Sequence, residues 1–190
     1  MTTEIRWRIV TLQVVLVLVL GLCAGFLFWG SSFISGMIHD QLVAQKIFFP
    51  PSSEIRTGGA LDPAVFSQEI RNYAGQQVDN GDKARVYAND FIGVHLNEVA
   101  GGQTYSQVSA QAQANPTNLA LANQANTLFK GETLRGLLLN AYGWSQVAFY
   151  AFWAAIGLTV AAIAVFATLV FEVLVAPRTV RATKPTPIPA

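Results

Sequence analysis

Two long apolar stretches dominate the pattern of hydrophobic and polar positions. From position 9 to Ser31 the only polar side chains are those of Thr11, Gln13 and Cys23. From 147 to 176 the only residue charged at neutral pH is Glu172. Each stretch exceeds the ~20 residues that an α-helix needs to cross ~30 Å of hydrocarbon. The pattern predicts transmembrane helices over 9–36 and 147–176.

The region between them, 37–146, has helical rather than alternating periodicity in its first half. Apolar residues at Ile34, Ile38, Leu42 and Ile47 keep a spacing near 3.6 and extend the first helix towards Pro50 and Pro51, which should end it. Ser52 to Ala60 is predicted to be a loop. Asp62 followed by Pro63 predicts an N-cap and first helical position, and this helix should stop at Gly75.

The second half of this region predicts further helices. Asp82 should cap a helix that ends at Gly101 and Gly102. Its apolar face is expected to consist of Tyr87, Phe91, Val94, His95 and Val99. The segment from Thr104 to Ala114 is rich in Gln and Ala and has a less regular apolar stripe of Val108 and Ala112, before Asn115 and Pro116. A last helix, starting near Thr117, should continue into the second span, although Gly131 or Gly136 could interrupt it. The expected fold is all-α, with a helical domain between the spans.

The charges beside the two spans predict their orientation. The N-terminal segment 1–8 contains Arg6 and Arg8, and the proline-rich tail 177–190 contains three further basic residues, Arg178, Arg181 and Lys184. Because Lys and Arg in short flanking segments remain in the cytoplasm, both termini are predicted to be cytoplasmic and 37–146 extracytoplasmic. The expected location is therefore the cell membrane, with Trp29 and Trp153 marking the outer interface.

A cleaved signal peptide is the alternative for the first stretch, since Arg6 and Arg8 precede it. The stretch is much longer than the 7–15 apolar residues of a signal peptide, which favours an uncleaved anchor. A lipoprotein signal at Cys23 is disfavoured because Leu22 occupies the position where such signals have a small residue.

Small residues predict where the two spans meet. Helices in lipid associate through close packing of small side chains. The first span has Gly21 and Gly25 at a four-residue interval, and the second has Gly157 and Ala161. These four positions are expected to form a contact within one chain, with a partner subunit as the alternative. Glu172 lies near the inner interface, where it is expected to reach the headgroups or to pair with Arg8. A proton or ion pathway is the less favoured reading of Glu172.

Composition excludes several classes of function. The net charge of +1 and the lack of a basic stripe disfavour nucleic acid as a partner. The single cysteine, Cys23, rules out an intramolecular disulfide. No Gly-x-Ser-x-Gly, Walker or dinucleotide motif occurs in the sequence. The chain is therefore expected not to be an enzyme and to need no cofactor.

Two weak constellations could bind metal ions. His39 with Asp40 and His95 with Glu98 could in principle form a two-histidine, two-carboxylate site. The favoured alternative places His39 at the membrane interface and has His95 donating to a carbonyl at the core edge. The run from Asp79 to Asp82 resembles the start of a calcium loop, but the twelfth position is Asp90 rather than Glu, and a turn explains it as well. No metal site is predicted.

Several short motifs resemble those of a family of small actinobacterial membrane proteins. The motifs are Gln77-Val78-Asp79, the segment from Ala84 to Glu98, Gly101-Gly102-Gln103-Thr104-Tyr105 and Leu134-Arg135-Gly136-Leu137. The resemblance implies an N-terminal span, a short outer domain and a second apolar segment. Members are commonly labelled aromatic ring-opening dioxygenases. Non-haem iron of that type needs two histidines and a carboxylate, and this chain has only His39 and His95.

The favoured function is a non-catalytic accessory or scaffold subunit of a larger membrane complex, as a homo- or hetero-oligomer. An apolar chain with an ordered outer region and no catalytic set supports this hypothesis. A ligand-binding sensor is the alternative, since a helical outer domain between two spans is common in receptors. A metal-dependent membrane enzyme is a third reading and would require the two histidines to meet.

Overall fold

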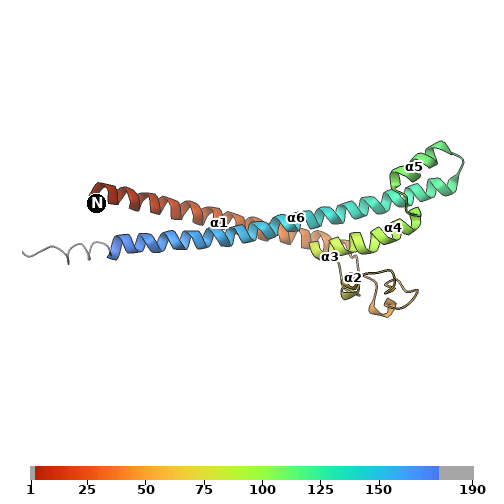
Figure 1. The fold of residues 1–190 in the computed structure, drawn as a ribbon, viewed down its shortest axis with the longest axis horizontal. Coiled ribbons are helices and arrows are strands. Elements are labelled where there is room, and N and C mark those ends of the chain that lie inside the picture. Colours follow the sequence, from red (N-terminus) through yellow and green to blue (C-terminus); the bar gives the residue numbers. More distant parts are fainter. Residues whose placement is uncertain (1–2, 176–190) are drawn as a thin grey trace, which may run out of the picture. The chain divides into compact units, whose positions relative to one another are not determined.

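The protein is built from helices joined by short loops, as described for residues 3–175 by a computed structural model (Figure 1). Two helices are far longer than the others: α1 spans Thr3–Gln45 and α6 spans Leu119–Val170. The remaining elements are η1 (Ser52–Glu54), α2 (Gln68–Asn72), α3 (Gly81–Val86), η2 (Tyr87–Ile92), α4 (Gly93–Ala100), α5 (Tyr105–Ala114) and η3 (Phe171–Val175). The all-α prediction is confirmed. The predicted tail, 177–190, lies outside the described residues.

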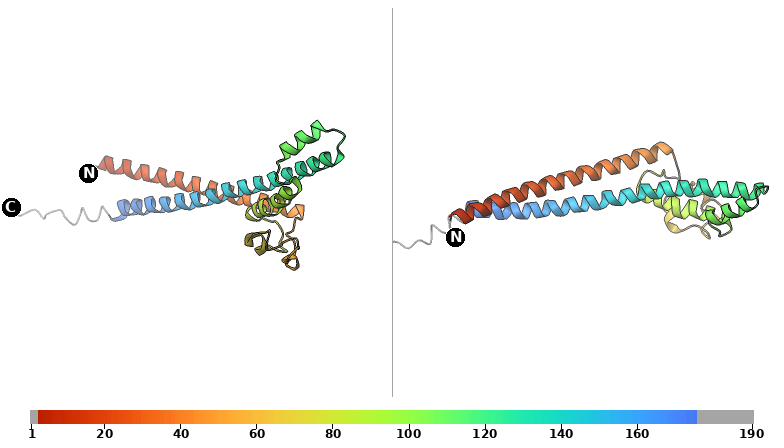
Figure 2. Two further views of the ribbon diagram at one scale, coloured as in Figure 1. Left: turned by 45° about the vertical axis from the view of Figure 1, so that its right-hand side comes forward. Right: turned by 90° about the horizontal axis from the view of Figure 1, so that it is seen from above.

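The chain divides into two compact units (Figure 2). The helix-pair unit consists, within the described residues, of 3–32 and 149–175. The helical unit consists of 33–148. Each of the two long helices therefore contributes one end to each unit.

In the helix-pair unit, α1 and α6 run antiparallel. The rings of Phe28 and Phe152 lie 5.6 Å apart, whereas at the other end Arg6 donates from Nη2 to the carbonyl oxygen of Glu172 at 2.8 Å. Between these contacts, Nε2 of Gln13 donates to Oγ1 of Thr168 at 3.4 Å. The residues that the pair buries are small, such as Ala24 and Ala155, because small side chains allow two helices to approach closely.

Helix α1 ends earlier than the two prolines require. Its last residue is Gln45, and Lys46 adopts a left-handed conformation with φ 52°. The carbonyl oxygen of Val43 accepts from the backbone of Lys46 at 3.1 Å and from Nε2 of Gln77 at 2.9 Å. A side chain from elsewhere in the unit therefore satisfies a carbonyl that the end of a helix leaves without an intrahelical partner.

A short antiparallel pairing follows directly after α1. The backbone N–H of Phe49 donates to Gln76 at 2.9 Å, and the N–H of Val78 donates to Ile47 at 2.9 Å. An isolated β-bridge joins Phe48 and Gln77, and residues 3–175 contain no longer strand. This pairing fixes the segment before α3 against the end of α1.

The predicted helix start at Asp62 is wrong. The carboxylate of Asp62 instead accepts the backbone N–H groups of Gly58 at 2.6 Å and Ala64 at 2.9 Å, which closes a turn in the loop. These two hydrogen bonds lower the pKa of the Asp62 carboxyl from its ordinary value. The helix begins at Gln68, where the hydroxyl of Ser67 accepts from the backbone of Ile70.

The helical region from Gly81 to Ala100 differs from the sequence prediction at both its start and its middle. Asn80, and not Asp82, is the N-cap, because its side chain accepts from the backbone of Lys83 at 3.0 Å. The middle segment, η2, is a π-helix. A π-helical turn contains extra backbone relative to an α-helix and rotates the face that follows. Val99 is consequently exposed, while Leu96 and Ala100 are buried.

The ends of α4 and α5 agree with the sequence. Gly101 adopts the left-handed conformation that ends α4, with φ 58°. Thr104 and Gln107 form a capping box at the start of α5. Asn115 follows the last residue of α5, as predicted.

Helix α6 then continues from Leu119 to Val170. The predicted continuation into the second apolar stretch is confirmed, and neither Gly131 nor Gly136 interrupts the helix. Gly131 instead allows α4 to approach α6, because a Cβ at this position would overlap with the side chain of Leu96.

Two apolar clusters form the core of the helical unit. The larger one joins α1, the loops, α2, α3, η2 and α6, and consists of Ile38, Leu42, Phe49, Leu61, Phe66, Ile70, Val78, Ala84, Val86, Ala88 and Leu138. The smaller one joins α4, α5 and α6, and consists of Leu96, Ala100, Val108 and Leu128. Both long helices thus supply side chains to the larger core as well as to the helix-pair unit.

Candidate interaction sites

The helix-pair unit contains an apolar groove of about 410 Å³ between α1 and α6. It is lined by Val17, Gly21, Ala24, Gly25, Phe28, Thr159, Ala162, Ile163 and Phe166. Gly21 and Gly25 therefore face α6, but Gly157 and Ala161 are not among the lining residues. A Cβ at Gly21, Gly25 or Gly157 would meet no other atom within 4 Å. Two of the four small positions therefore line this groove, and the predicted contact among all four stays a prediction.

The polar groups of this unit are bonded mainly to α-helical backbone. Thr159 donates from Oγ1 to the carbonyl of Ala155 at 2.8 Å, and Thr168 donates to Val165 at 2.7 Å. Arg6, rather than Arg8, contacts Glu172, and it does so at the backbone carbonyl. Among the described residues, Glu172 and Arg8 form no ion pair.

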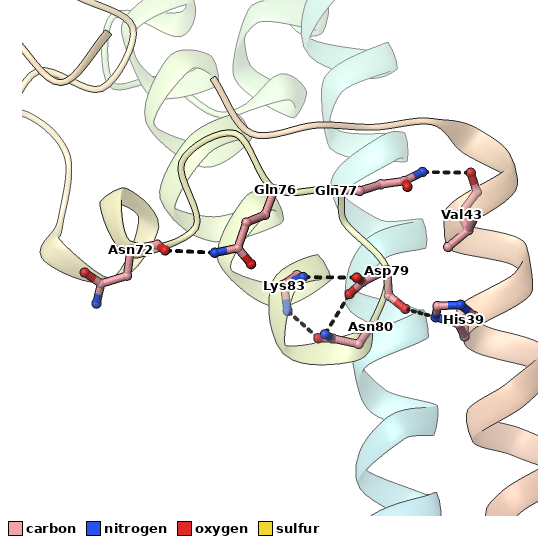
Figure 3. A network of polar contacts seen from close by, with 8 residues as sticks. All are labelled: His39, Val43, Asn72, Gln76, Gln77, Asp79, Asn80 and Lys83. Carbon is pink, nitrogen blue, oxygen red and sulfur yellow. Dashed lines mark hydrogen bonds and ion pairs between the residues drawn. The ribbon is translucent and has the colours of Figure 1, made fainter. Parts of the chain in front are cut away.

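A polar network in the helical unit ties the segment before α3 to α1 (Figure 3). The ring nitrogen Nδ1 of His39 lies 3.0 Å from the carbonyl oxygen of Asp79, which can only accept, so Nδ1 is the donor. Lys83 donates from Nζ to the Asp79 carboxylate at 3.1 Å, and Nδ2 of Asn80 donates to Oδ1 of the same carboxylate at 2.8 Å. These contacts hold in place the turn that contains Asn80, the N-cap of α3.

The two histidines lie in different surroundings and do not share a partner. Nδ1 of His95 lies 2.8 Å from the carbonyl oxygen of Phe91, one turn earlier, so His95 donates there. Its ring also packs 4.5 Å from the ring of Phe91 and 5.6 Å from that of Phe66. Within residues 3–175 no group of three His, Cys, Asp or Glu side chains is placed to hold a metal ion.

The residues of the suggested calcium loop have other partners. The side chain of Asn80 caps α3, and the carboxylate of Asp79 is bound by Lys83 and Asn80. Asp90, at the twelfth position, accepts from the hydroxyl of Ser67 at 3.0 Å. These oxygens therefore take part in helix capping and in loop contacts.

Aromatic rings form a continuous row that includes Phe49 of the larger core and the rings packed against it. Phe49 lies between Tyr73 at 5.5 Å and Tyr87 at 5.2 Å, and Tyr87 lies 5.0 Å from Phe91. Burial raises the pKa of the Tyr87 phenol, because the phenolate loses solvation there. Since η2 supplies both Tyr87 and Phe91, the π-helical turn aligns two rings of this row.

A cavity of about 290 Å³ lies between α1 and α6 within the helical unit. Its lining residues are Met37, Ile38, Gln41, Leu42, Gln45, Leu137, Leu138, Asn140, Ala141 and Trp144. Sequence reasoning did not identify it. The only available signal was the one-turn spacing that places Gln41 with Gln45, and Asn140 with Trp144, on the same helix face.

Tyr105, the first residue of α5, and Phe129 of α6 form an exposed aromatic pair. The rings of Tyr105 and Phe129 lie 5.7 Å apart, with exposed fractions of 38% and 54%. Together with Ala125 and Asn126 they line a shallow hollow of about 230 Å³. Exposed aromatic side chains beside a hollow are typical of protein interaction surfaces.

Comparison with known proteins gives no relative: no family model, curated protein or solved structure matches the chain. The resemblance to small actinobacterial membrane proteins therefore stays a prediction. The class of protein that the structure defines is an all-α chain in which two long apolar helices flank a helical middle region.

Proposed function

We propose that the protein is a two-span membrane protein that serves as a non-catalytic accessory or scaffold subunit of a larger membrane complex. The observation that supports this proposal best is the apolar surface that the chain leaves uncovered. It has two parts, one on the long helices and one on the helical unit.

The long helices support the membrane location through their low burial. In the most apolar windows of α1 and α6, only 11% and 6% of the residues are buried. A core helix of a water-soluble protein would have most of such a window covered. The following large apolar residues are more than half exposed: Leu12, Leu18, Leu22, Phe26, Trp29, Val160, Ile163 and Phe166. Lipid is the solvent in which this surface is stable.

The hydrogen bonds of three threonine hydroxyls in the helix-pair unit also suit a bilayer. A hydroxyl group in hydrocarbon needs a partner, because no water is present to replace one. The hydroxyls of Thr11, Thr159 and Thr168 each donate to a carbonyl one turn earlier in their own helix. Their polarity is thereby satisfied without a partner chain.

Both termini are proposed to be cytoplasmic and the helical unit extracytoplasmic. We expect a cysteine at the exposed Gln111, in a Cys23→Ser background, to react with a membrane-impermeant thiol reagent in intact cells. Cysteines at Thr3 and Thr186 should react only after permeabilisation, because basic residues retain both ends inside. Labelling of either tail in intact cells would contradict the orientation.

The aromatic pair Tyr105 and Phe129 supports the accessory role, since it is exposed on the helical unit. We expect the wild-type chain, extracted from its native membrane in mild detergent, to migrate as a complex much larger than one chain. Phe129→Ala should release most of the chain from that complex, because truncation of a buried aromatic anchor typically costs about 2 kcal/mol or more of binding, roughly 30-fold in affinity.

The matched control for this experiment is Gln111→Ala, an exposed substitution on α5 outside the hollow, which should leave the complex intact. Native gel electrophoresis followed by mass spectrometry measures both results. A wild-type particle with the mass of a single chain would contradict the accessory role. If the complex stays intact in Phe129→Ala, the surface around Tyr105 and Phe129 is not part of the interface.

A further inference from the structure

The cavity between α1 and α6 in the helical unit has an apolar floor and a polar rim. The floor consists of Ile38, Leu42 and Leu138, which are 6%, 2% and 1% exposed and belong to the larger core. At its opening Met37, Leu137 and Trp144 are 39%, 65% and 51% exposed. Apolar side chains therefore continue from the core out to the surface along one side of the cavity.

Three amide side chains lie on the rim. Gln41 and Gln45 are one turn apart on α1, and Asn140 lies on α6 one turn before Trp144. Within residues 3–175 no hydrogen bond is made by these three side chains, although an amide has two donors and an acceptor. The lining contains no ionisable residue.

We propose that this cavity binds an uncharged amphiphile. Its apolar chain would lie on Ile38, Leu42 and Leu138, and its hydroxyl- or amide-bearing head would contact Gln41, Gln45 and Asn140. The exposed indole of Trp144 offers an apolar face and one N–H donor, which suits the junction between chain and head. Binding here does not require the proposed accessory role.

The chemistry of the lining selects this ligand class. A charged head would lose solvation without gaining an opposite charge, which is costly in a partly apolar site. A purely apolar molecule would cover the floor but would deprive the three amides of water. The volume of about 290 Å³ is close to the lower limit, about 300 Å³, of small-molecule sites, so one chain of moderate length fits better than a bulky lipid.

The test uses the full-length protein with Trp144 as the only tryptophan, after Trp7, Trp29 and Trp153 are replaced by Phe. The chain is placed in nanodiscs of phosphatidylcholine. The probes are monoacylglycerols with bromine on the acyl chain, which quench tryptophan fluorescence on contact. A long-chain probe is supplied within the disc and a short-chain probe from solution. Saturable quenching by either supports the proposal, and the effective probe identifies the bilayer or the aqueous phase as the source.

Substitutions in the cavity distinguish binding of the probe there from its partitioning into the bilayer. Gln41→Ala and Asn140→Ala should each raise the apparent dissociation constant by about three- to tenfold, the effect of losing one hydrogen bond. Ala141→Leu, which fills the cavity, should abolish saturable quenching. Asn123→Ala, an exposed substitution elsewhere on α6, should change nothing. A brominated alkyl sulfate of the same length should bind more weakly.

Three results would overturn the proposal. The first is quenching that does not saturate, or that is the same in the Gln41, Asn140 and Ala141 variants as in the wild type. The second is equal or tighter binding of the alkyl sulfate. The third combines two observations: no quenching of Trp144 by the probes, and efficient disulfide formation between two chains that carry Met37→Cys in a Cys23→Ser background. A second copy of the chain would then cover the cavity.

Discussion

Gly81→Ala is expected to destabilise the helical unit by about 1–3 kcal/mol, the usual effect of forcing an extra carbon into a packed site. Gly81 is buried at the start of α3, and its added Cβ would overlap with Cβ and Oγ of Ser145 and lie 3.3 Å from Cα of Tyr142. Rotation of the serine hydroxyl cannot remove the overlap with its Cβ. The helices α3 and α6 would have to separate.

A pair of second-site changes tests this reason for the destabilisation. Ser145→Gly removes both overlapping atoms, so Gly81→Ala should cost much less in that background. Ser145→Ala retains the Cβ and should give no such relief. Gly136→Ala is the matched control, because a Cβ there meets no atom within 4 Å and alanine favours a helix over glycine by about 1 kcal/mol.

Thermal denaturation of the full-length chain in mild detergent measures these changes. For a chain of this size a shift of about 2–4 °C corresponds to 1 kcal/mol. The close-packing explanation fails if Gly81→Ala and Gly136→Ala give the same midpoint. It also fails if the cost of Gly81→Ala does not depend on residue 145.

Leu128→Ala is expected to lower the free energy of unfolding by about 2–5 kcal/mol, more than any other substitution proposed for the smaller core. The Leu128 side chain is 2% exposed and packs with Leu96, Ala100 and Val108. Its truncation removes apolar contact and leaves a cavity that the helices cannot easily close. Because this cluster joins α4 and α5 to α6, we expect α5 to become sensitive to proteases.

The neighbouring residue provides the control. Phe129 is 54% exposed, so Phe129→Ala should lower the stability by about 1 kcal/mol or less. Limited proteolysis together with thermal denaturation distinguishes the two variants. Equal loss of stability at 128 and 129 would mean that α5 does not pack on α6 as described. A stable Phe129→Ala chain that still loses the complex would separate folding from partner binding.

Local signals in the sequence predicted several helix ends correctly. Gly101 ends α4 because glycine adopts the left-handed conformation at little cost. Asn115 follows the last residue of α5, where the sequence placed the end of that segment. The N-cap of α5 is equally local, because the Thr104 hydroxyl accepts from the backbone N–H of Gln107. In each of these cases the deciding interaction lies within a few residues of the helix end, so the sequence alone contains it.

Two predicted helix caps were wrong because the structure has other hydrogen bonds at those turns. Asp62 was expected to cap a helix, but its carboxylate closes a turn with Gly58 and Ala64. Asp82 was expected to cap α3, but Asn80 does so within a network that includes His39 of α1. Local preference allows both outcomes, and contacts with distant segments select one of them.

The cavity between α1 and α6 could not be predicted from local sequence either. Its individual residues were visible in the sequence, but Gln41 and Asn140 are separated by almost one hundred positions, and no local pattern relates them. They line the same cavity because Ile38 and Leu42 of α1 share a core with Leu138 of α6. The aromatic hollow at Tyr105 and Phe129 likewise depends on how α5 packs on α6.

The two long apolar helices, the helical nature of the region between them and the helix ends set by adjacent residues can all be predicted from the order of residues alone. These features depend on hydrophobic periodicity and on short-range hydrogen bonds, which act along the chain. The uninterrupted course of α6, the π-helical turn in η2 and the cavity between α1 and α6 become visible only in the folded chain. The cavity depends on packing between segments far apart in sequence, which outweighs local preference when large apolar areas are buried.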